Sequence, residues 1–322
     1  MHKIPIGGYF SLELPLHEEY HKDAIKLNTG RNCLEYILRA RRYDKVYIPY
    51  YTCEVVLEPL QKLGIAYEFY HINIHLEIQD EICLKANEAL LYTNYYGLKQ
   101  RYVEKLAAKY GRQLIVDNTQ AFYDRPAKGV CTFNTCRKFF GVSDGAYLYC
   151  DERLDEEFSQ DVSYDHTTFL TKRIDLGAEA GFVDYRKQDD GMVGQPIKRM
   201  SNFTERMMQS IDYQSIAAKR RANYEYLHAS LGAENNLVLP LDEDTVPMVY
   251  PYFVLVKGLR EKLIENKIFV ARYWPNVLEW TTKDDIENLL TFQMVPLPID
   301  QRYGEEEMNY IISIIKEYNG IK

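Results

Sequence analysis

The chain contains the stretch Leu114-Ile115-Val116-Asp117-Asn118-Thr119-Gln120. A second stretch, Gly129-Val130-Cys131-Thr132-Phe133, follows and runs directly into Asn134-Thr135-Cys136-Arg137-Lys138-Phe139-Phe140-Gly141. Each stretch begins with the short apolar run of a buried strand. The first predicted strand therefore ends in a carboxylate, Asp117. The second leads to Lys138, with the hydroxyl of Thr135 three residues before it and two aromatic residues after it.

These residue types match the requirements of pyridoxal phosphate chemistry. An Asp keeps the pyridinium nitrogen protonated so that the ring withdraws electrons, a Lys binds the aldehyde covalently, and a hydroxyl holds the phosphate. Asp117, Lys138 and Thr135 would take these roles. The alternative is an ordinary core Asp and a solvated surface Lys, and these residues alone would favour that alternative.

Five segments in a fixed order extend the pattern. They are Leu27-Asn28-Thr29-Gly30-Arg31-Asn32, Val46-Tyr47-Ile48-Pro49-Tyr50-Tyr51-Thr52, Asp117-Asn118-Thr119-Gln120, Arg137-Lys138-Phe139-Phe140-Gly141-Val142-Ser143-Asp144-Gly145 and Val295-Pro296-Leu297-Pro298-Ile299-Asp300-Gln301-Arg302-Tyr303. Over nearly its whole length the chain resembles the sugar aminotransferases of the DegT/DnrJ/StrS family, a branch of the fold-type I pyridoxal phosphate enzymes. The segments are similar to that family's phosphate turn, Pro-x-x-Thr strand end, Asp-x-x-Gln, lysine segment and closing motif.

The resemblance implies an α/β fold of the fold-type I pyridoxal phosphate transferases. Such a fold has a large domain, in which helices sandwich a mostly parallel sheet, and a smaller C-terminal α/β domain. We expect the large cofactor-binding domain, with the N-terminal segment, at residues 1–205 and the small domain at residues 206–322.

Apolar periodicity supports this fold class independently. Up to residue ~150, strand-like and helix-like runs alternate, which predicts a mostly parallel sheet with helices on both faces. The expected strands are 45–51, 65–72, 89–96, 113–116 and 129–133, and the expected helices are 31–42, 53–63 and 101–110. Further on we expect loops at 161–199, strands at 248–256 and 268–274, and helices at 211–231, 259–265 and 305–318. Ligands in such sheets bind beyond the carboxyl ends of the strands, where Tyr50, Asn94, Asp117 and Thr135 fall.

The predicted phosphate site combines a helix start with side-chain donors. Thr29, Gly30 and Arg31 lie where a loop turns into a helix, and the free N–H groups of a helix N-terminus bind anions. Thr135 is the expected second phosphate contact, with Asn134 as the alternative donor.

Three further features of the site come from the resemblance. Gln120 is similar to the family glutamine that hydrogen-bonds near the phenolic oxygen of the cofactor, although a satisfied core amide is the alternative. Cys53 stands where an aromatic residue usually stacks on the cofactor ring, so either its sulfur packs there or Tyr51 or Tyr96 does. The family's Asn-x-Arg segment reaches across a dimer to the phosphate, and Asn202-Phe203-Thr204-Glu205-Arg206 retains it only in displaced form. We expect Asn202 and Arg206 to contribute to the neighbouring subunit's site.

Composition narrows the class of protein. Of 322 residues, 46% are hydrophobic and 27% are charged, as in a soluble globular enzyme. The net charge of −8 argues against nonspecific binding to nucleic acid or to membrane surfaces, so an anionic substrate needs a local cationic pocket. No run approaches the ~20 apolar residues of a membrane helix. No long apolar stretch follows residues 1–5, so no secretory signal is expected.

Six scattered cysteines favour a reducing cytoplasm. Cys131 and Cys136 lack a second Cys or His pair at ligand spacing, so no metal site is predicted. Glycine-rich nucleotide motifs are also missing from the sequence.

The sequence therefore predicts a cytoplasmic, homodimeric aminotransferase that uses pyridoxal 5'-phosphate. By the resemblance, it would move an amino group from an amino acid such as glutamate to a keto sugar linked to a nucleotide, in polysaccharide or glycoconjugate biosynthesis. Another reaction of the same cofactor on a related sugar or amino acid is one alternative. Dehydrating relatives carry His in place of the lysine, so Lys138 favours transamination. A non-catalytic regulatory or assembly protein of the same fold is the other alternative.

Overall fold

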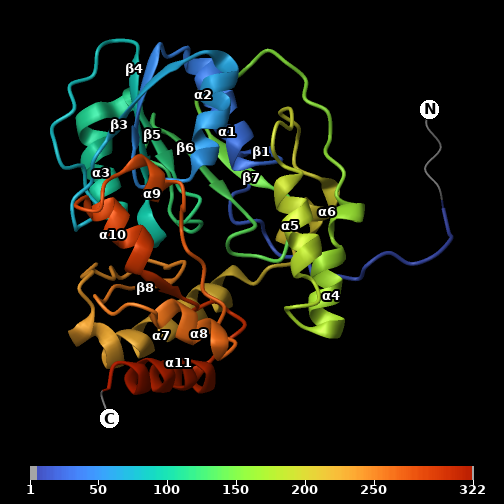
Figure 1. The fold of residues 1–322 in the computed structure, drawn as a ribbon. Helices are drawn as coiled ribbons and strands as arrows, with labels where there is room; N and C mark the ends of the chain where they lie inside the picture. Colours follow the sequence, from blue (N-terminus) through green and yellow to red (C-terminus); the bar gives the residue numbers. More distant parts are fainter. Residues whose placement is uncertain (1–5, 321–322) are drawn as a thin grey trace.

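The computed structural model describes residues 6–320, so residues 1–5, where a secretory signal would begin, lie outside the described residues. A seven-stranded sheet forms the centre of the first half of the chain, in the order β1-β7-β6-β5-β4-β2-β3 (Figure 1). Its strands are β1 (Ile25–Leu27), β2 (Lys45–Pro49), β3 (Ala66–Tyr70), β4 (Glu88–Thr93), β5 (Leu114–Asp117), β6 (Cys131–Thr135) and β7 (Ala146–Tyr149). The neighbouring strands from β6 to β3 pair in parallel, and β7 runs antiparallel to both β6 and β1.

Strand residues alternate between two separate hydrophobic cores. Ile115, Cys131 and Phe133 belong to the core beneath helices α1 (Gly30–Arg41) and α2 (Leu57–Leu63), whereas Leu114 and Val116 belong to the core on the other face. Helix α3 (Gln100–Tyr110) packs into that second core through Val103 and Leu106. The period-two alternation of a strand buried on both faces therefore explains why these runs are almost continuously apolar.

Most of the second half of the chain lies below the sheet in Figure 1, with helix α9 (Val277–Trp280) beside the sheet. This half also contains α7 (Tyr213–Leu231), β8 (Tyr250–Tyr252), α8 (Leu259–Glu265), α10 (Ile286–Gln293), β9 (Val295–Leu297) and α11 (Glu305–Tyr318). Strands β8 and β9 pair antiparallel as a two-stranded sheet.

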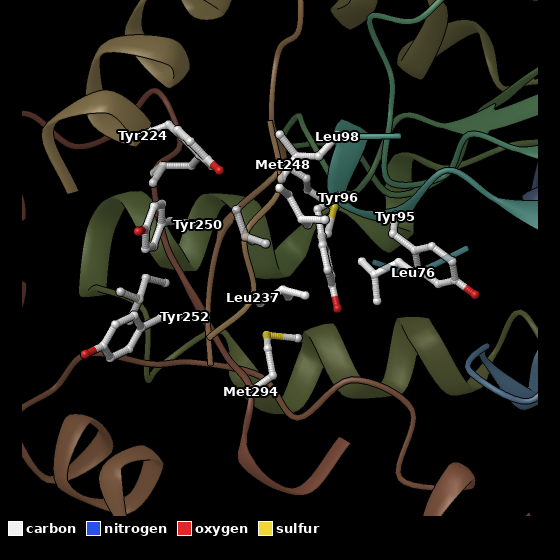
Figure 2. Packing of buried hydrophobic residues seen from close by; sticks show 14 of the residues in the cluster. Leu76, Tyr95, Tyr96, Leu98, Tyr224, Leu237, Met248, Tyr250, Tyr252 and Met294 are labelled. Atoms are coloured by element: carbon white, nitrogen blue, oxygen red, sulfur yellow. The ribbon is translucent and has the colours of Figure 1, made fainter. Parts of the chain in front are cut away.

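A continuous apolar core joins the two halves. Figure 2 shows Tyr96 and Leu98, which follow β4, beside Leu237 and Met248 from the second half. The Met248 amide donates a hydrogen bond to the Tyr96 carbonyl over 2.9 Å. Because this core is shared, the second half is held rigidly against the carboxyl ends of the strands.

Helix α6 (Asn202–Met208) packs against the first half of the chain and spans the domain boundary predicted at 205/206. Two further helices, α4 (Thr168–Leu176) and α5 (Phe182–Asp190), occupy the region where loops were predicted, so that prediction was wrong. Neither helix contains a buried residue. Without an apolar face against a core, the sequence lacks the helical periodicity that a packed helix would show.

The predicted strand at residues 268–274 was also wrong. Ile268 and Val270 are buried and Phe269 is exposed, so the alternation of a strand is present. However, Lys267 and Trp274 at the two ends adopt left-handed backbone conformations, and β8 pairs instead with β9. Alternating burial shows that a segment is extended and half-buried, but it does not identify a hydrogen-bonding partner.

Candidate active site

The start of helix α1 lies against the carboxyl ends of β5 and β6. Thr29 is the N-cap of α1, and its Oγ1 accepts a hydrogen bond from the amide of Asn32 over 3.2 Å. A Cβ atom on Gly30 would lie 3.5 Å from Cγ2 of Thr119 and 3.7 Å from the ring of Phe133. The helix N-terminus, with its free amides and positive dipole end, is therefore next to the turn that follows Asp117.

Asp117, Thr119 and Lys138 form a compact polar group at this edge. The Lys138 Nζ donates to Oγ1 of Thr119 over 2.9 Å, and the Thr119 amide donates to Oδ1 of Asp117 over 2.8 Å. Burial raises the pKa of Asp117, while the nearby Lys138 charge and the hydrogen bonds of Thr119 oppose that rise. The carboxylate is thus buried with one cation, Lys138, close to it.

Lys138 faces a cavity of about 800 Å³. Lys138 is an exposed residue in the lining of this cavity. Partial desolvation by the surrounding protein lowers the pKa of Lys138, and the charges of Asp117 and Cys53 partly counteract this effect. A lowered pKa increases the fraction of neutral amine, which is the nucleophilic form of a lysine.

The backbone beside Lys138 is held by residues from the second half of the chain. The Phe139 carbonyl accepts a 2.8 Å hydrogen bond from Nε2 of Gln301 and a 3.4 Å hydrogen bond from the guanidinium of Arg220. Arg220 also lies over the Phe139 ring, with 4.5 Å between its Cζ and the ring centroid. Since Gln301 belongs to the predicted closing motif, that motif helps to fix the lysine segment.

Gln120 and the aromatic residues near it are tightly buried. Oε1 of Gln120 accepts the amide of Tyr96 over 3.0 Å, but its Nε2 is buried without a hydrogen-bond partner among residues 6–320. The rings of Tyr51 and Tyr96 are fully buried, and their hydroxyls bond to each other over 2.8 Å. Cys53 is only partly buried and lies near enough to Lys138 to affect its pKa. Of the three predicted stacking candidates, Cys53 is the one whose side chain is not enclosed by protein.

The phosphate-site candidates divide into two groups. Thr135 shares its strand face with Phe133, which packs under α1, so Thr135 lies on the side of the helix N-terminus. Asn134 lies on the opposite face, where its Nδ2 is 3.0 Å from Nε2 of the buried His21. Arg31 points to helix α2, where its Nε forms a 3.1 Å ion pair with Glu58. Thr135 therefore lies on the same face of the sheet as Thr29 and Gly30, and Asn134 lies on the other face.

Asn202 and Arg206 lie on α6, outside the group around Lys138. Arg206 donates hydrogen bonds of 2.5 and 2.9 Å to the carbonyls of Leu14 and Pro15 in the extended N-terminal segment. Asn202 is exposed at the first position of the helix. Their predicted contribution to a neighbouring subunit's site remains a prediction.

Sequence reasoning missed Thr119, Arg220 and Gln301 as participants. Thr119 belongs to the Asp-x-x-Gln segment. Its hydroxyl follows the end of β5 by two residues, and this position could have indicated that it lies in the site. Arg220 lies on a helix 81 residues from Gln301 in sequence, and no local pattern connects the two.

Neither a protein-family model nor a curated protein sequence matches the chain. Solved structures do match it. DesV from S. venezuelae is 16% identical, with a TM-score of 0.65 over 92% of this chain and 84% of that one. A DegT DnrJ EryC1 StrS aminotransferase from Brucella abortus is 13% identical, with a TM-score of 0.61 over 94% and 89%. The E. coli GDP-4-keto-6-deoxy-D-mannose-3-dehydratase is 15% identical, with a TM-score of 0.60 over 91% and 87%.

At these identities the similarity shows the fold. The predicted fold class is confirmed: a mostly parallel sheet with flanking helices, as in the aminotransferases of this type. None of the helices within residues 6–320 is both long enough and apolar enough to cross a membrane.

Proposed function

We propose that this chain is a pyridoxal phosphate-dependent aminotransferase of the DegT/DnrJ/StrS type. It would transfer an amino group from an amino acid such as glutamate to the keto group of a nucleotide-linked sugar. The observation that carries the proposal is the group formed by Lys138, Thr119 and Asp117 beside the N-terminus of α1. The fold similarity to a Brucella abortus aminotransferase of this type supports it.

The residues present fit this cofactor. The buried Asp117 carboxylate can pair with a protonated ring nitrogen, and the unpartnered Nε2 of Gln120 is a buried donor that requires an acceptor. The amides at the start of α1, with Thr29 and Thr135, suit a phosphate. Lys138 is the amine available for the aldehyde. When bound, the cofactor supplies an electron-withdrawing ring that stabilises negative charge on the substrate carbon next to the nitrogen.

The chain's own residues then manage protons and orientation. Lys138, with its lowered pKa, can accept a proton at Nζ near neutral pH and return it to another atom within its reach. Thr119 holds that nitrogen in place through its 2.9 Å hydrogen bond. Arg220 and Gln301 fix the peptide carbonyl that follows Lys138, which limits where the lysine side chain can swing.

The cavity in front of Lys138 suits an anionic, partly aromatic substrate. Its lining includes the cations Arg173, Lys267 and Arg302 together with several aromatic rings. The chain has a net charge of −8, so this local concentration of cations is the kind of pocket that an anionic substrate needs. Carboxylate groups of an amino donor and phosphates of a nucleotide sugar are both compatible with it.

Lys138 favours transamination over dehydration. One protein of the same fold is a sugar dehydratase. According to the family resemblance, dehydrating members carry His at the lysine position, and this chain has Lys138 there.

The proposal includes a homodimer in the cytoplasm, with a large domain up to residue 205 and a small domain from residue 206. Apolar side chains are highly exposed on two regions, the N-terminal segment with Tyr9 and Phe10, and helices α4 and α5 with Ile174 and Val183. Contiguous exposed apolar surface is typical of interaction sites, which supports the dimer. Scattered free cysteines among residues 6–320 support the reducing compartment. A role in polysaccharide or glycoconjugate biosynthesis follows from the proposed substrate.

Two measurements test the activity. The purified protein should absorb at about 400–430 nm when it carries the cofactor. It should also convert a keto sugar linked to a nucleoside diphosphate into the amino sugar when glutamate is present. Absence of both the absorbance and turnover, after the protein has been incubated with pyridoxal 5'-phosphate, would contradict the proposal.

Complementation tests the shared site. In a mixed dimer of Lys138→Ala and Asn202→Ala chains, one site carries both lesions and the other carries neither. Activity should therefore reappear on mixing the two inactive proteins. Failure to recover activity after proven subunit exchange would mean that Asn202 does not act in the neighbouring subunit's site. Repeating the experiment with Arg206→Ala tests Arg206 in the same way.

A further inference from the structure

A second polar cluster lies at the carboxyl end of β3, the strand at the edge of the sheet. It contains His71, just after β3, with Asp285 and Glu287 at the start of helix α10. One side-chain nitrogen or oxygen from each of the three residues lies within 4.8 Å of the other two. The His71 Nδ1 is 3.1 Å from Oε1 of Glu287. At this distance the two side chains form a hydrogen bond, and a similar ~3.3 Å separates two ligand atoms around a tetrahedral zinc ion.

Glu287 is the most constrained member of the cluster. Only 1% of the residue is exposed, and its Oε1 accepts the amide of Ile72 over 2.7 Å. Its other oxygen, Oε2, is buried without any hydrogen-bond partner among the described residues. Buried carboxylate oxygens without partners are rare because their desolvation is not compensated.

The charge of the cluster is also poorly compensated. Within residues 6–320, no Lys or Arg forms an ion pair with Glu287 or Asp285, and the only basic group near Glu287 is His71. The positive end of α10 contributes roughly 0.3–1 kcal/mol to a carboxylate in its first turn, whereas burying an ion costs several kcal/mol. The helix dipole is therefore too weak to balance the buried carboxylate of Glu287, whereas the half-buried Asp285 is stabilised by its hydrogen bonds from Thr282, which lower its pKa.

The surroundings hold the three side chains in position. The His71 ring packs against Tyr50, with 4.5 Å between the ring centroids. Thr282 donates from its amide and its hydroxyl to Oδ2 of Asp285, which leaves Oδ1 for another partner. A cavity of about 570 Å³ opens onto the cluster, and Asn73 and Gln79 add further oxygen atoms to its lining. The cavity can supply water ligands.

We propose that His71, Asp285 and Glu287 bind a divalent transition-metal ion such as Zn²⁺. One imidazole and two carboxylates are a ligand set that Zn²⁺ and neighbouring divalent metals accept, with water completing the coordination. The ion would supply the missing partner for Oε2 of Glu287 and the missing positive charge. Because the ligands come from segments more than 200 residues apart, as the separation of 216 between His71 and Glu287 shows, no sequence spacing reveals the site.

The ion would act as a link between the two halves of the molecule. It would connect the end of β3 to helix α10, next to the contact between Phe69 and Trp280 of α9, whose ring centroids are 4.9 Å apart. It does not depend on the cofactor, so its test is independent of the proposed aminotransferase activity.

Titration of the full-length, chelator-treated protein with Co²⁺ tests the proposal. We expect one Co²⁺ ion per chain, with visible d–d absorption and without a sulfur-to-cobalt charge-transfer band, since the ligands are nitrogen and oxygen. Glu287→Gln and His71→Ala should each weaken binding by at least about tenfold. His71 is partly exposed, so its substitution tests the site even if Glu287→Gln impairs folding.

Asp284→Asn is the matched control, because Asp284 is exposed and lines the same cavity but is not one of the three proposed ligands. Its affinity for Co²⁺ should stay within about threefold of the unaltered protein. Three results would overturn the proposal: no stoichiometric binding, an equal loss in Asp284→Asn, or a charge-transfer band that persists in His71→Ala. The last result would place the metal at the buried thiols Cys131 and Cys150 with Glu152.

Discussion

Asp117 and Glu287 are both carboxylates buried in this fold, with 6% and 1% of each residue exposed, but their surroundings differ. Asp117 has Lys138 nearby and a hydrogen bond from the Thr119 amide, and it borders the site proposed for a cationic ring. Glu287 has one oxygen bonded to the Ile72 amide and the other without a partner in the described chain. A buried carboxylate therefore marks a place where a positive group is needed, and we propose an organic cation beside Asp117 and a metal ion beside Glu287.

The largest effect is expected at Asp117. Asp117→Ala should leave the fold intact and lower turnover by several orders of magnitude, because the ring nitrogen of the cofactor would lose the partner that keeps it protonated. Steady-state kinetics with saturating pyridoxal 5'-phosphate measure this. Turnover within about tenfold of the unaltered enzyme, a barrier change of only ~1.4 kcal/mol, would break the assignment of Asp117.

Arg220 is a buried residue of the opposite charge to Asp117 and Glu287. Arg220 is 2% exposed and forms no ion pair with a carboxylate among the described residues, and burial lowers the pKa of its guanidinium to about 10. It donates instead to Gln301 and to the carbonyls of Met248 and Phe139. Arg220→Met should lower the free energy of unfolding by roughly 2–4 kcal/mol, since these acceptors lose their donor.

The neighbouring Arg221 provides the control for that measurement. Arg221 also donates to two backbone carbonyls, of Asp242 and Thr245, but its side chain is 25% exposed, so water can replace it. Arg221→Met should cost about 1 kcal/mol or less in a denaturant titration. If both substitutions lower the free energy of unfolding by the same amount, the burial of Arg220 does not add to its contribution to stability.

A smaller effect concerns the stability of the cofactor-free protein. Burial raises the pKa of Asp117 above its unfolded value of about 3.9, so the charged form is disfavoured in the folded state. This carboxylate therefore reduces stability as the pH rises through its folded pKa. Asp117→Asn should raise the free energy of unfolding by on the order of 1 kcal/mol at neutral pH, and the gain should vanish below the unfolded pKa. A loss of stability at neutral pH would show that Lys138 fully compensates Asp117.

Glu287→Gln is the corresponding change in the second cluster. In chelator-treated protein, its effect on unfolding should be small, within about 1 kcal/mol, because the amide oxygen still accepts the Ile72 amide and the uncompensated charge is removed. With added Zn²⁺, the unaltered protein should gain thermal stability and Glu287→Gln should not. Destabilisation by more than about 2 kcal/mol without metal would indicate that His71 alone balances the charge.

Local patterns explain which parts of the fold could be predicted. Buried strands such as β5 are short apolar runs with a polar residue at the end, and the helix ends at Arg41 and Leu63 are followed by the left-handed residues Arg42 and Gly64. Helices α8 and α11 were predicted at their observed bounds. These features depend on neighbours in sequence, so the sequence carries their signal.

The parts that could not be predicted depend on residues far apart in sequence. The contact of Gln301 with the Phe139 carbonyl joins positions 162 residues apart, and the cluster at Glu287 depends on His71. Helices α4 and α5 bury no residue in either core, so no packed apolar stripe marks them in the sequence. Local periodicity cannot report a long-range contact or an unburied helix.

Covalent trapping at Lys138 tests the central claim most directly. The purified protein is incubated with pyridoxal 5'-phosphate and reduced with borohydride, and its peptides are then mapped by mass spectrometry. We expect a single pyridoxyl adduct on Lys138, which is lost in Lys138→Ala, because this amine bonds Thr119 beside Asp117 and has a lowered pKa. An adduct on Lys128 or on another lysine, with Lys138 unmodified, would contradict it.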